Sequence, residues 1–370
     1  GEISHQGMRN MKRILTTAAV LTAAATTAQA GGVERSGQSV AILFEQGRYA
    51  EISYGHFDPS VSGTAPLALG GASSGDMTPS YNSWSLGYKM DLGDRMALAI
   101  ILDQPIGADV AYPTGSGYPL AEATATLSSS AITALLKYRF ENNVSVYGGL
   151  RYQTVHGEVA LGPAVGNYTL NTNHDSELGY VVGLAWEKPE IAARVALTYN
   201  SAITHSLESV EFGVPTAGFD TEVPQSVNLE FQTGIAKDTL LFGSIRWVEW
   251  SAFVIDPPTY QLLPPTTPLV SYASNRISYN LGVGRRFNEN WSGAVTIGYE
   301  ESDGEITGNL GPTDGFASVG LAASYTMDNI KITGGVRYVD IGDATANLGP
   351  GASFTNNSGI GIGLRVGYTF

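Results

Sequence analysis

The sequence predicts an all-β protein, a transmembrane antiparallel β-barrel of about fourteen strands. Three observations predict it. Segments between turn residues alternate apolar and polar side chains at period two, and their connections alternate between short and long. The last segment, residues 361–370, has one wholly apolar face that ends on Phe370. Strands that separate lipid from a polar lumen need two such faces, and a terminal aromatic suits the membrane interface.

Residues 1–30 are interpreted as an upstream extension and a signal peptide. Met11-Lys12-Arg13 is basic, the residues after it are apolar and small, and Ala28-Gln29-Ala30 has the form of a cleavage site. A membrane anchor is the alternative, but the apolar stretch is short and rich in Ala and Thr. We then expect residues 31–47 to form a short N-terminal segment that could plug the lumen, and residues 48–370 to form the barrel.

Composition narrows the class of function. The 370 residues include 45 Gly and 19 Tyr, have no Cys, and carry a formal net charge of −14. The absence of Cys excludes disulfides and a thiol nucleophile, and the acidic charge argues against a nucleic-acid partner. The sequence has no metal-spaced His/Cys cluster, phosphate loop or dinucleotide motif, so we expect neither an enzyme nor a bound metal or cofactor.

The connections between the expected strands are of two kinds. Short polar ones include 91–95, 188–190 and 327–329, whereas the others are long and rich in Gly, Pro and Ser. Short turns on one side and long loops on the other are typical of an outer-membrane barrel with both termini in the periplasm. A soluble sandwich or propeller, the alternative fold, predicts no such alternation. The strands start near residues 48, 81, 96, 122, 143, 170, 191, 221, 239, 270, 290, 313, 329 and 355, and the long connections are 61–80, 106–121, 204–220 and 254–269.

Charges fix which face of each strand points into the lumen. A charge on the lipid face at mid-membrane costs roughly 2–4 kcal/mol, so the charged faces are expected inside. The alternation fails at Arg246 and Glu249, where a bulge or an interface position is needed. The basic lumen residues are Arg151, Arg194, Arg276 and Arg337. Aromatic residues beside the short turns are expected to form the periplasmic girdle, and they are Tyr138, Phe140, Trp186, Phe287, Trp291, Tyr325 and Phe370.

Four short motifs resemble the FadL-type outer-membrane transporters of long-chain fatty acids and aromatic hydrocarbons. Residues 196–201 are similar to that family's "LTYRS" strand, with Asn200 where Arg is usual. Residues 224–226, 250–253 and 298–302 are similar to its "LP", "W-S-x-F" and "Y-D-D-S" segments. The resemblance covers most of the chain after the signal peptide. It implies a fourteen-stranded barrel with an N-terminal hatch inside and a break in the third strand that opens a lateral exit.

Two segments bear on that implied mechanism. The third expected strand contains Pro105 and Gly107, and a break is expected there because Pro cannot donate a ladder hydrogen bond. The alternative is that the strand simply ends there before a loop. The N-terminal segment departs from the family, because residues 31–47 are fewer than the usual hatch and have no "NPA" motif. A plug this short puts the family's gating mechanism in doubt.

The long loops are unusually apolar and are the candidate ligand site. Exposed apolar clusters usually mark a surface for a ligand or partner. The alternative is that these side chains pack on one another to cap the barrel, or touch lipid. The lumen arginines could hold a carboxylate, or they could pair with lumen acids such as Glu230 and Glu300. The candidate ligand-binding residues of the loops are Tyr112, Phe212, Phe219, Ile255, Tyr260, Leu262 and Leu263.

The sequence hypothesis is therefore a channel in the bacterial outer membrane for passive uptake of a hydrophobic small molecule. The ligand is a long-chain fatty acid or an aromatic hydrocarbon, captured by the apolar loops and released through the third-strand break. Further expected partners are membrane lipid and lipopolysaccharide, the latter bridged by divalent cations to loop acids; a monomer is expected. The alternative function is a general diffusion porin with a water-filled lumen.

Overall fold

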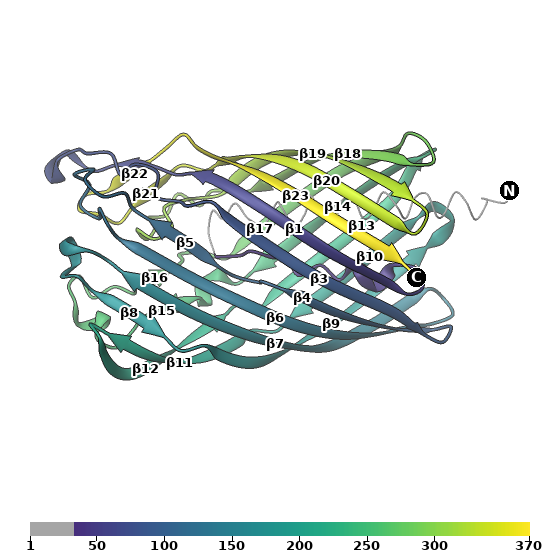
Figure 1. Cartoon of the computed structure of the whole chain (residues 1–370), viewed down its shortest axis with the longest axis horizontal. Helices are drawn as coiled ribbons and strands as arrows, with labels where there is room; N and C mark the ends of the chain where they lie inside the picture. Colours follow the sequence, from purple (N-terminus) through teal and green to yellow (C-terminus); the bar gives the residue numbers. More distant parts are fainter. Residues whose placement is uncertain (1–32) are drawn as a thin grey trace.

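The computed structural model describes residues 33–370, so the predicted signal peptide lies outside the described residues. Fourteen strands close into one antiparallel barrel, which confirms the predicted fold class (Figure 1). Closure comes from the pairing of the first strand with the last, from Tyr49↔Thr369 to Ser60↔Ser358. The strands are β1 (Tyr49–Ser60), β3 (Tyr81–Leu92), β4 (Met96–Asp103) continued by β5 (Ala108–Ala111), β6 (Thr124–Arg139), β7 (Val144–Ala160), β9 (Asp175–Lys188), β10 (Ala193–Asn200), β13 (Ser226–Ala236), β14 (Thr239–Val248), β17 (Arg276–Arg286), β18 (Trp291–Glu300), β19 (Phe316–Met327), β20 (Ile330–Ile341) and β23 (Asn357–Thr369).

The two ends of the barrel differ in their connections. At one end, which we call the short-turn end, links such as 237–238 and 328–329 join successive strands, and the C-terminus lies there (Figure 1). The opposite, long-loop end carries the long connections. The expected strand starts agree with the observed ones to within six residues, the largest difference being at β17, which was expected near 270 and begins at Arg276.

The connection expected as the loop 204–220 is instead a β-hairpin. It consists of β11 (Ile203–Glu211) and β12 (Val214–Val223), and β11 also pairs with β8 (Thr169–Thr172). The two strands of this hairpin were not predicted because two inward positions of β11 hold the polar residues His205 and Ser209. The expected alternation has apolar residues at such positions. Other connections contain shorter strands. β22 (Ala352–Phe354) pairs with both β2 (Gly63–Thr64) and β21 (Ala344–Ala346), and β15 (Val254–Ile255) pairs with β16 (Val270–Ser271).

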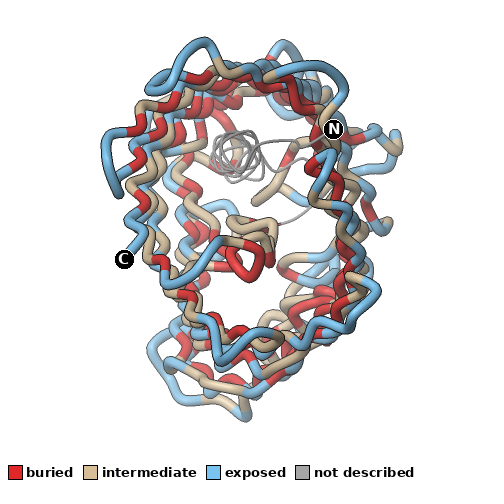
Figure 2. Tube along the Cα trace, turned by 90° about the vertical axis from the view of Figure 1, so that its right-hand side faces the viewer, coloured by how far each residue is buried: buried red, intermediate tan, exposed pale blue. Residues whose placement is uncertain are grey.

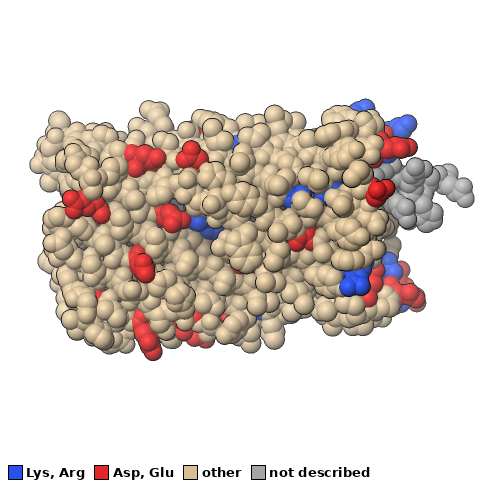
Figure 3. Space-filling model, viewed as in Figure 1, with Lys and Arg blue, Asp and Glu red and all other residues tan. Residues whose placement is uncertain are grey.

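The outer surface carries a belt of exposed apolar side chains. On β9 they occupy every second position from Leu178 to Trp186, and their exposed fractions lie between 44% and 59%. In a space-filling view the middle of the visible face is largely free of charge, and Lys and Arg gather near the short-turn end (Figure 3). Six of the seven predicted girdle aromatics are exposed, and Tyr325 is half-buried. No described residues form a helix long and apolar enough to cross a membrane.

The inner surface carries the charges, as the alternation predicted. Viewed along its axis, the ring of strands encloses further chain (Figure 2). The outlier Arg246 is also buried, and no bulge is needed, because β14 ends at Val248 and Glu249 lies beyond the ladder. The four predicted lumen arginines are 2–8% exposed, and they are Arg151, Arg194, Arg276 and Arg337.

Candidate functional site

The N-terminal segment 33–47 lies inside the barrel and is held there by lumen side chains. The Arg246 guanidinium contacts the Glu34 carboxylate at 2.5 Å, and the Asn228 amide donates to the carbonyl of Gly37 at 2.8 Å. The Glu230 carboxylate accepts two bonds, from the Ser39 hydroxyl at 2.6 Å and the Val40 N–H at 3.1 Å. These contacts reach across much of the sequence and tie the segment to β13 and β14.

A short 3₁₀ helix, η1 (Ala41–Phe44), completes this plug on the side of the short turns. Its Phe44 ring lies 4.4 Å from the Arg194 guanidinium and 4.5 Å from the Lys137 ammonium, measured to the ring centroid. Tyr147 meets the same ring edge-on at 6.4 Å. A cation over an aromatic face is attracted by the quadrupole of the ring. The Phe44 ring therefore anchors η1 to the lumen although it cannot form a conventional hydrogen bond.

The third strand of the barrel is broken between β4 and β5. The ladder to β6 runs to Asp103↔Ala131 and resumes at Ala108↔Leu127. Four residues, 104–107, therefore stand opposite three, 128–130. The kink points toward the plug, because the Pro105 carbonyl accepts from the Arg35 N–H at 2.8 Å and Gly107 N–H donates to the Val33 carbonyl at 2.8 Å.

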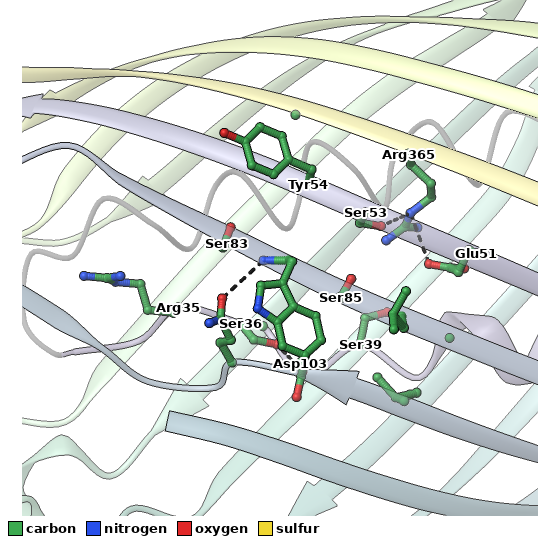
Figure 4. Close-up of a pocket in the computed structure, with 18 of the residues that line it drawn as sticks. Arg35, Ser36, Ser39, Glu51, Ser53, Tyr54, Ser83, Ser85, Asp103 and Arg365 are labelled. Atoms are coloured by element: carbon green, nitrogen blue, oxygen red, sulfur yellow. Dashed lines mark hydrogen bonds and ion pairs between the residues drawn. The ribbon is translucent and has the colours of Figure 1, made fainter. Parts of the chain in front are cut away.

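Beside this kink the wall between β3 and β4 is open. Pairing of the two strands stops at Leu86↔Leu102, so residues 81–85 keep ladder partners only on β1. One bond crosses the gap, from the Trp84 N–H to the side-chain oxygen of Gln104 at 3.2 Å. A cavity of about 140 Å³, the lateral gap, lies here (Figure 4). Its polar lining includes Ser36, Ser39, Ser53, Ser83, Ser85 and Asp103.

A second cavity, of about 80 Å³, lies in the long-loop half of the lumen. We call it the apolar cavity. Among the described residues, none of those that line it is Lys, Arg, Asp or Glu. It is lined by Val33, Ile106, Phe253 and Leu310 together with residues of β5 to β8, of the β11–β12 hairpin, and of β15 and β16.

The predicted ligand residues of the loops fall into three groups. Phe219 and Ile255 line the apolar cavity. Tyr112, Tyr260 and Leu263 pack into an apolar cluster that caps the lumen, where Tyr112 stacks on Tyr118 with ring centroids 5.5 Å apart. The remaining two lie at the surface, Phe212 with 43% and Leu262 with 78% of their area exposed.

A buried carboxylate holds this cap together. Glu211 accepts hydrogen bonds from the Tyr168 hydroxyl at 2.7 Å and from the N–H groups of Thr259 and Tyr260 at 2.9 and 3.1 Å. Burial alone would raise the pKa of Glu211, but these hydrogen bonds favour the ionised form and lower its pKa overall. The carboxylate therefore joins the β11–β12 hairpin to the loop that follows β15.

The four predicted lumen arginines lie elsewhere, and none of them is among the residues that line the apolar cavity. Arg276 pairs with Asp314 at 2.9 Å and with Asp303 at 3.2 Å. Arg151 donates to the Thr133 hydroxyl and to the side-chain oxygen Oδ1 of Asn200, both at 3.0 Å. Arg194 faces Phe44 in the plug, and Arg337 donates to the Ser318 hydroxyl.

One polar cluster in the lumen was not singled out from the sequence. The His205 ring lies between Asp175, with Nδ1 3.0 Å from a carboxylate oxygen, and the Gln153 amide nitrogen, 3.1 Å from Nε2. The three residues belong to different strands, so no local motif could reveal them. Within residues 33–370, no group of three or more potential metal ligands comes together.

No protein-family model matches the sequence, and no curated protein matches it. Solved structures do match. A FadL homologue of Pseudomonas aeruginosa is 14% identical, with 94% of this chain and 97% of that chain covered and a TM-score of 0.69. This chain has the FadL-type barrel fold. The Pseudomonas putida toluene transporter TodX is 13% identical, with 93% of this chain and 96% of that chain covered and a TM-score of 0.63. The Ralstonia pickettii toluene transporter TbuX is 12% identical, with 94% of this chain and 98% of that chain covered and a TM-score of 0.61.

Proposed function

We propose that this chain is an outer-membrane channel for passive uptake of small hydrophobic molecules. The observation that carries the proposal is an uncharged, apolar cavity inside a barrel whose adjoining wall strand is broken. An apolar solute that enters the cavity gains roughly 25 cal/mol per Å² of apolar surface removed from water. The solved structures of similar fold include two toluene transporters, which agrees with this class of solute.

The kinked segment supports a lateral exit for the solute. Val33 and Ile106 line the apolar cavity, whereas Ser36 and Gln104 line the lateral gap. The kink and the part of the plug bonded to it thus contribute to the lining of both spaces. A movement of residues 104–107 would join them, and the solute would pass sideways between β3 and β4 into the membrane.

The lining of the apolar cavity favours a neutral solute over a fatty acid. A carboxylate buried there would lose its hydration and find neither Lys nor Arg among the lining residues that the structure describes. The lumen arginines already have polar or aromatic partners. At the long-loop end, we propose that Leu262 and Phe212 make the first contact with the solute, and that Phe219 and Ile255 hold it inside. Tyr112, Tyr260 and Leu263 support that site from the cap.

A general diffusion porin remains the second candidate, because the lumen carries charges. The plug argues against it, since residues 33–47 cross the lumen and are bonded to β13 and β14. Conductance of the protein in a planar bilayer separates the two functions. A large steady current would support the porin, and little current is expected here.

The break in the third strand offers a sharp test of uptake. Deleting Pro105 leaves three residues opposite three and restores a regular ladder, whereas Pro105→Ala keeps the surplus residue and is the matched control. Cells that express each form are given radiolabelled p-xylene or oleate. We expect p-xylene to accumulate with the wild type and with Pro105→Ala, and much less with the deletion. If cells with the wild type accumulate neither compound, the proposed uptake function is wrong. If cells with the deletion accumulate p-xylene as the wild type does, the proposed lateral exit is wrong.

A further inference from the structure

Over residues 203–207 and 219–223, the inner face of the β11–β12 hairpin presents one polar pair between two apolar pairs. Directly opposite residues on its inner face are Ile203↔Val223, His205↔Thr221 and Leu207↔Phe219. Both members of the middle pair line the apolar cavity and are buried, with exposed fractions of 0% and 6%. Polar side chains at such positions are disfavoured unless their hydrogen bonds are satisfied.

The imidazole of His205 is fully engaged. An amide nitrogen can only donate, so Nε2 of His205 accepts from Gln153 and Nδ1 carries the proton that points to Asp175. This arrangement is a neutral ring with both nitrogens occupied. The carboxylate behind the ring also makes this part of the wall unfavourable for an anion.

Thr221, by contrast, is not satisfied. Within residues 33–370 its buried hydroxyl oxygen has no hydrogen-bond partner. The Thr172 hydroxyl, which lines the same cavity, is already used, since it accepts from the Gly157 N–H and donates to the Asn173 carbonyl. A buried hydroxyl without a partner destabilises the empty site, and a ligand group that pairs with it removes that cost.

We propose that Thr221 recognises a neutral hydroxyl group on an otherwise apolar ligand, so that the preferred substrates are phenols and related hydroxylated aromatics. This inference rests on the proposed function, because it assigns the substrate class of the apolar cavity. The ring of the ligand lies among Leu207, Phe219 and their apolar neighbours. Its hydroxyl meets the Thr221 Oγ1, which can either donate or accept, while the neutral His205 ring beside it leaves no cation for a carboxylate.

A pair of nearly isosteric ligands tests this. p-Cresol and p-xylene differ by one hydroxyl in place of a methyl group, and Thr221→Val removes the side-chain hydroxyl at nearly constant volume. Calorimetric titration of the purified protein in detergent gives a dissociation constant for each ligand. The p-xylene to p-cresol ratio of these constants is expected to fall about three- to tenfold in Thr221→Val, as for the loss of one neutral hydrogen bond. Partition into micelles cancels between variants.

Two further variants make the result decisive. Thr204→Val changes an exposed Thr on the outer face of β11, the other strand of the same hairpin, and its ratio should equal that of the wild type. Thr221→Ser keeps a hydroxyl and should retain the preference for p-cresol. An unchanged ratio in Thr221→Val overturns this inference but leaves the proposed function standing. Failure of the wild type to bind either ligand overturns both.

Discussion

The two halves of the barrel are built with opposite polarity. Toward the short turns, apolar side chains face outward and the interior holds charged groups such as Arg194, Lys137 and Glu230. Toward the long loops, the interior is an apolar cluster that includes Tyr168 and Phe354, each with 0% of its area exposed. The difference is explained by what surrounds each half. A surface in contact with lipid is apolar outside, whereas a part surrounded by water buries its apolar side chains inside. The apolar cavity therefore lies in one half, and the η1 end of the plug, with Arg194 and Lys137 around Phe44, lies in the other.

The largest expected effect follows from removing the ion pair between Arg246 and Glu34 that holds the plug. Arg246→Met leaves the Glu34 carboxylate buried without its counter-charge, which costs about 3–5 kcal/mol for such pairs. We expect the plug to detach and the single-channel conductance in a planar bilayer to rise. The double variant Arg246→Met with Glu34→Met removes both charges and should restore a low conductance. Equal conductance in the wild type and the single variant would show that this pair does not hold the plug.

The next effect concerns the outer surface. Val182 lies at the middle of β9 and is 48% exposed on the outer face. Val182→Lys is expected to lower the free energy of unfolding by roughly 2–4 kcal/mol in lipid vesicles, measured by denaturant titration. Leu262→Lys, at a surface position of the long-loop end, is the control and should change it by less than about 0.5 kcal/mol. Equal effects at the two sites would contradict the assignment of lipid and water to the two halves.

The smallest effect tests the cap by pH. The pKa of Glu211 is lowered from its ordinary value of 4.5, so its contribution to stability is complete above that value. The contribution is lost as the pH falls through the lowered pKa of the folded state. The protection factors of the Thr259 and Tyr260 amides against hydrogen exchange, taken relative to the intrinsic rate at each pH, should therefore fall at acid pH in the wild type. Glu211→Gln should exchange faster already at neutral pH and show no such step; a step in this variant would assign it to another group.

The barrel wall could be predicted from sequence because lipid imposes a strict alternation on each strand. The kink was also expected, since Pro105 and Gly107 are local signals. The plug contacts could not be foreseen, because Ser39 and Glu230 are 191 residues apart. The His205 cluster was missed for the same reason, and the hairpin that carries it was missed because His205 and Ser209 interrupt the apolar pattern on its inner face.

The surplus residue of the third strand has a mechanical consequence. Hydrogen-bonded rungs to β6 continue on both sides of it, at Asp103↔Ala131 and at Ala108↔Leu127, so the strand stays attached to β6 while its other edge, toward β3, is open. A solute that leaves by this window does not have to pass Arg194 and Lys137 at the short-turn end of the plug. The ion conductance of the protein and its transport of hydrophobic molecules would then be independent. A mutation could change either one without changing the other.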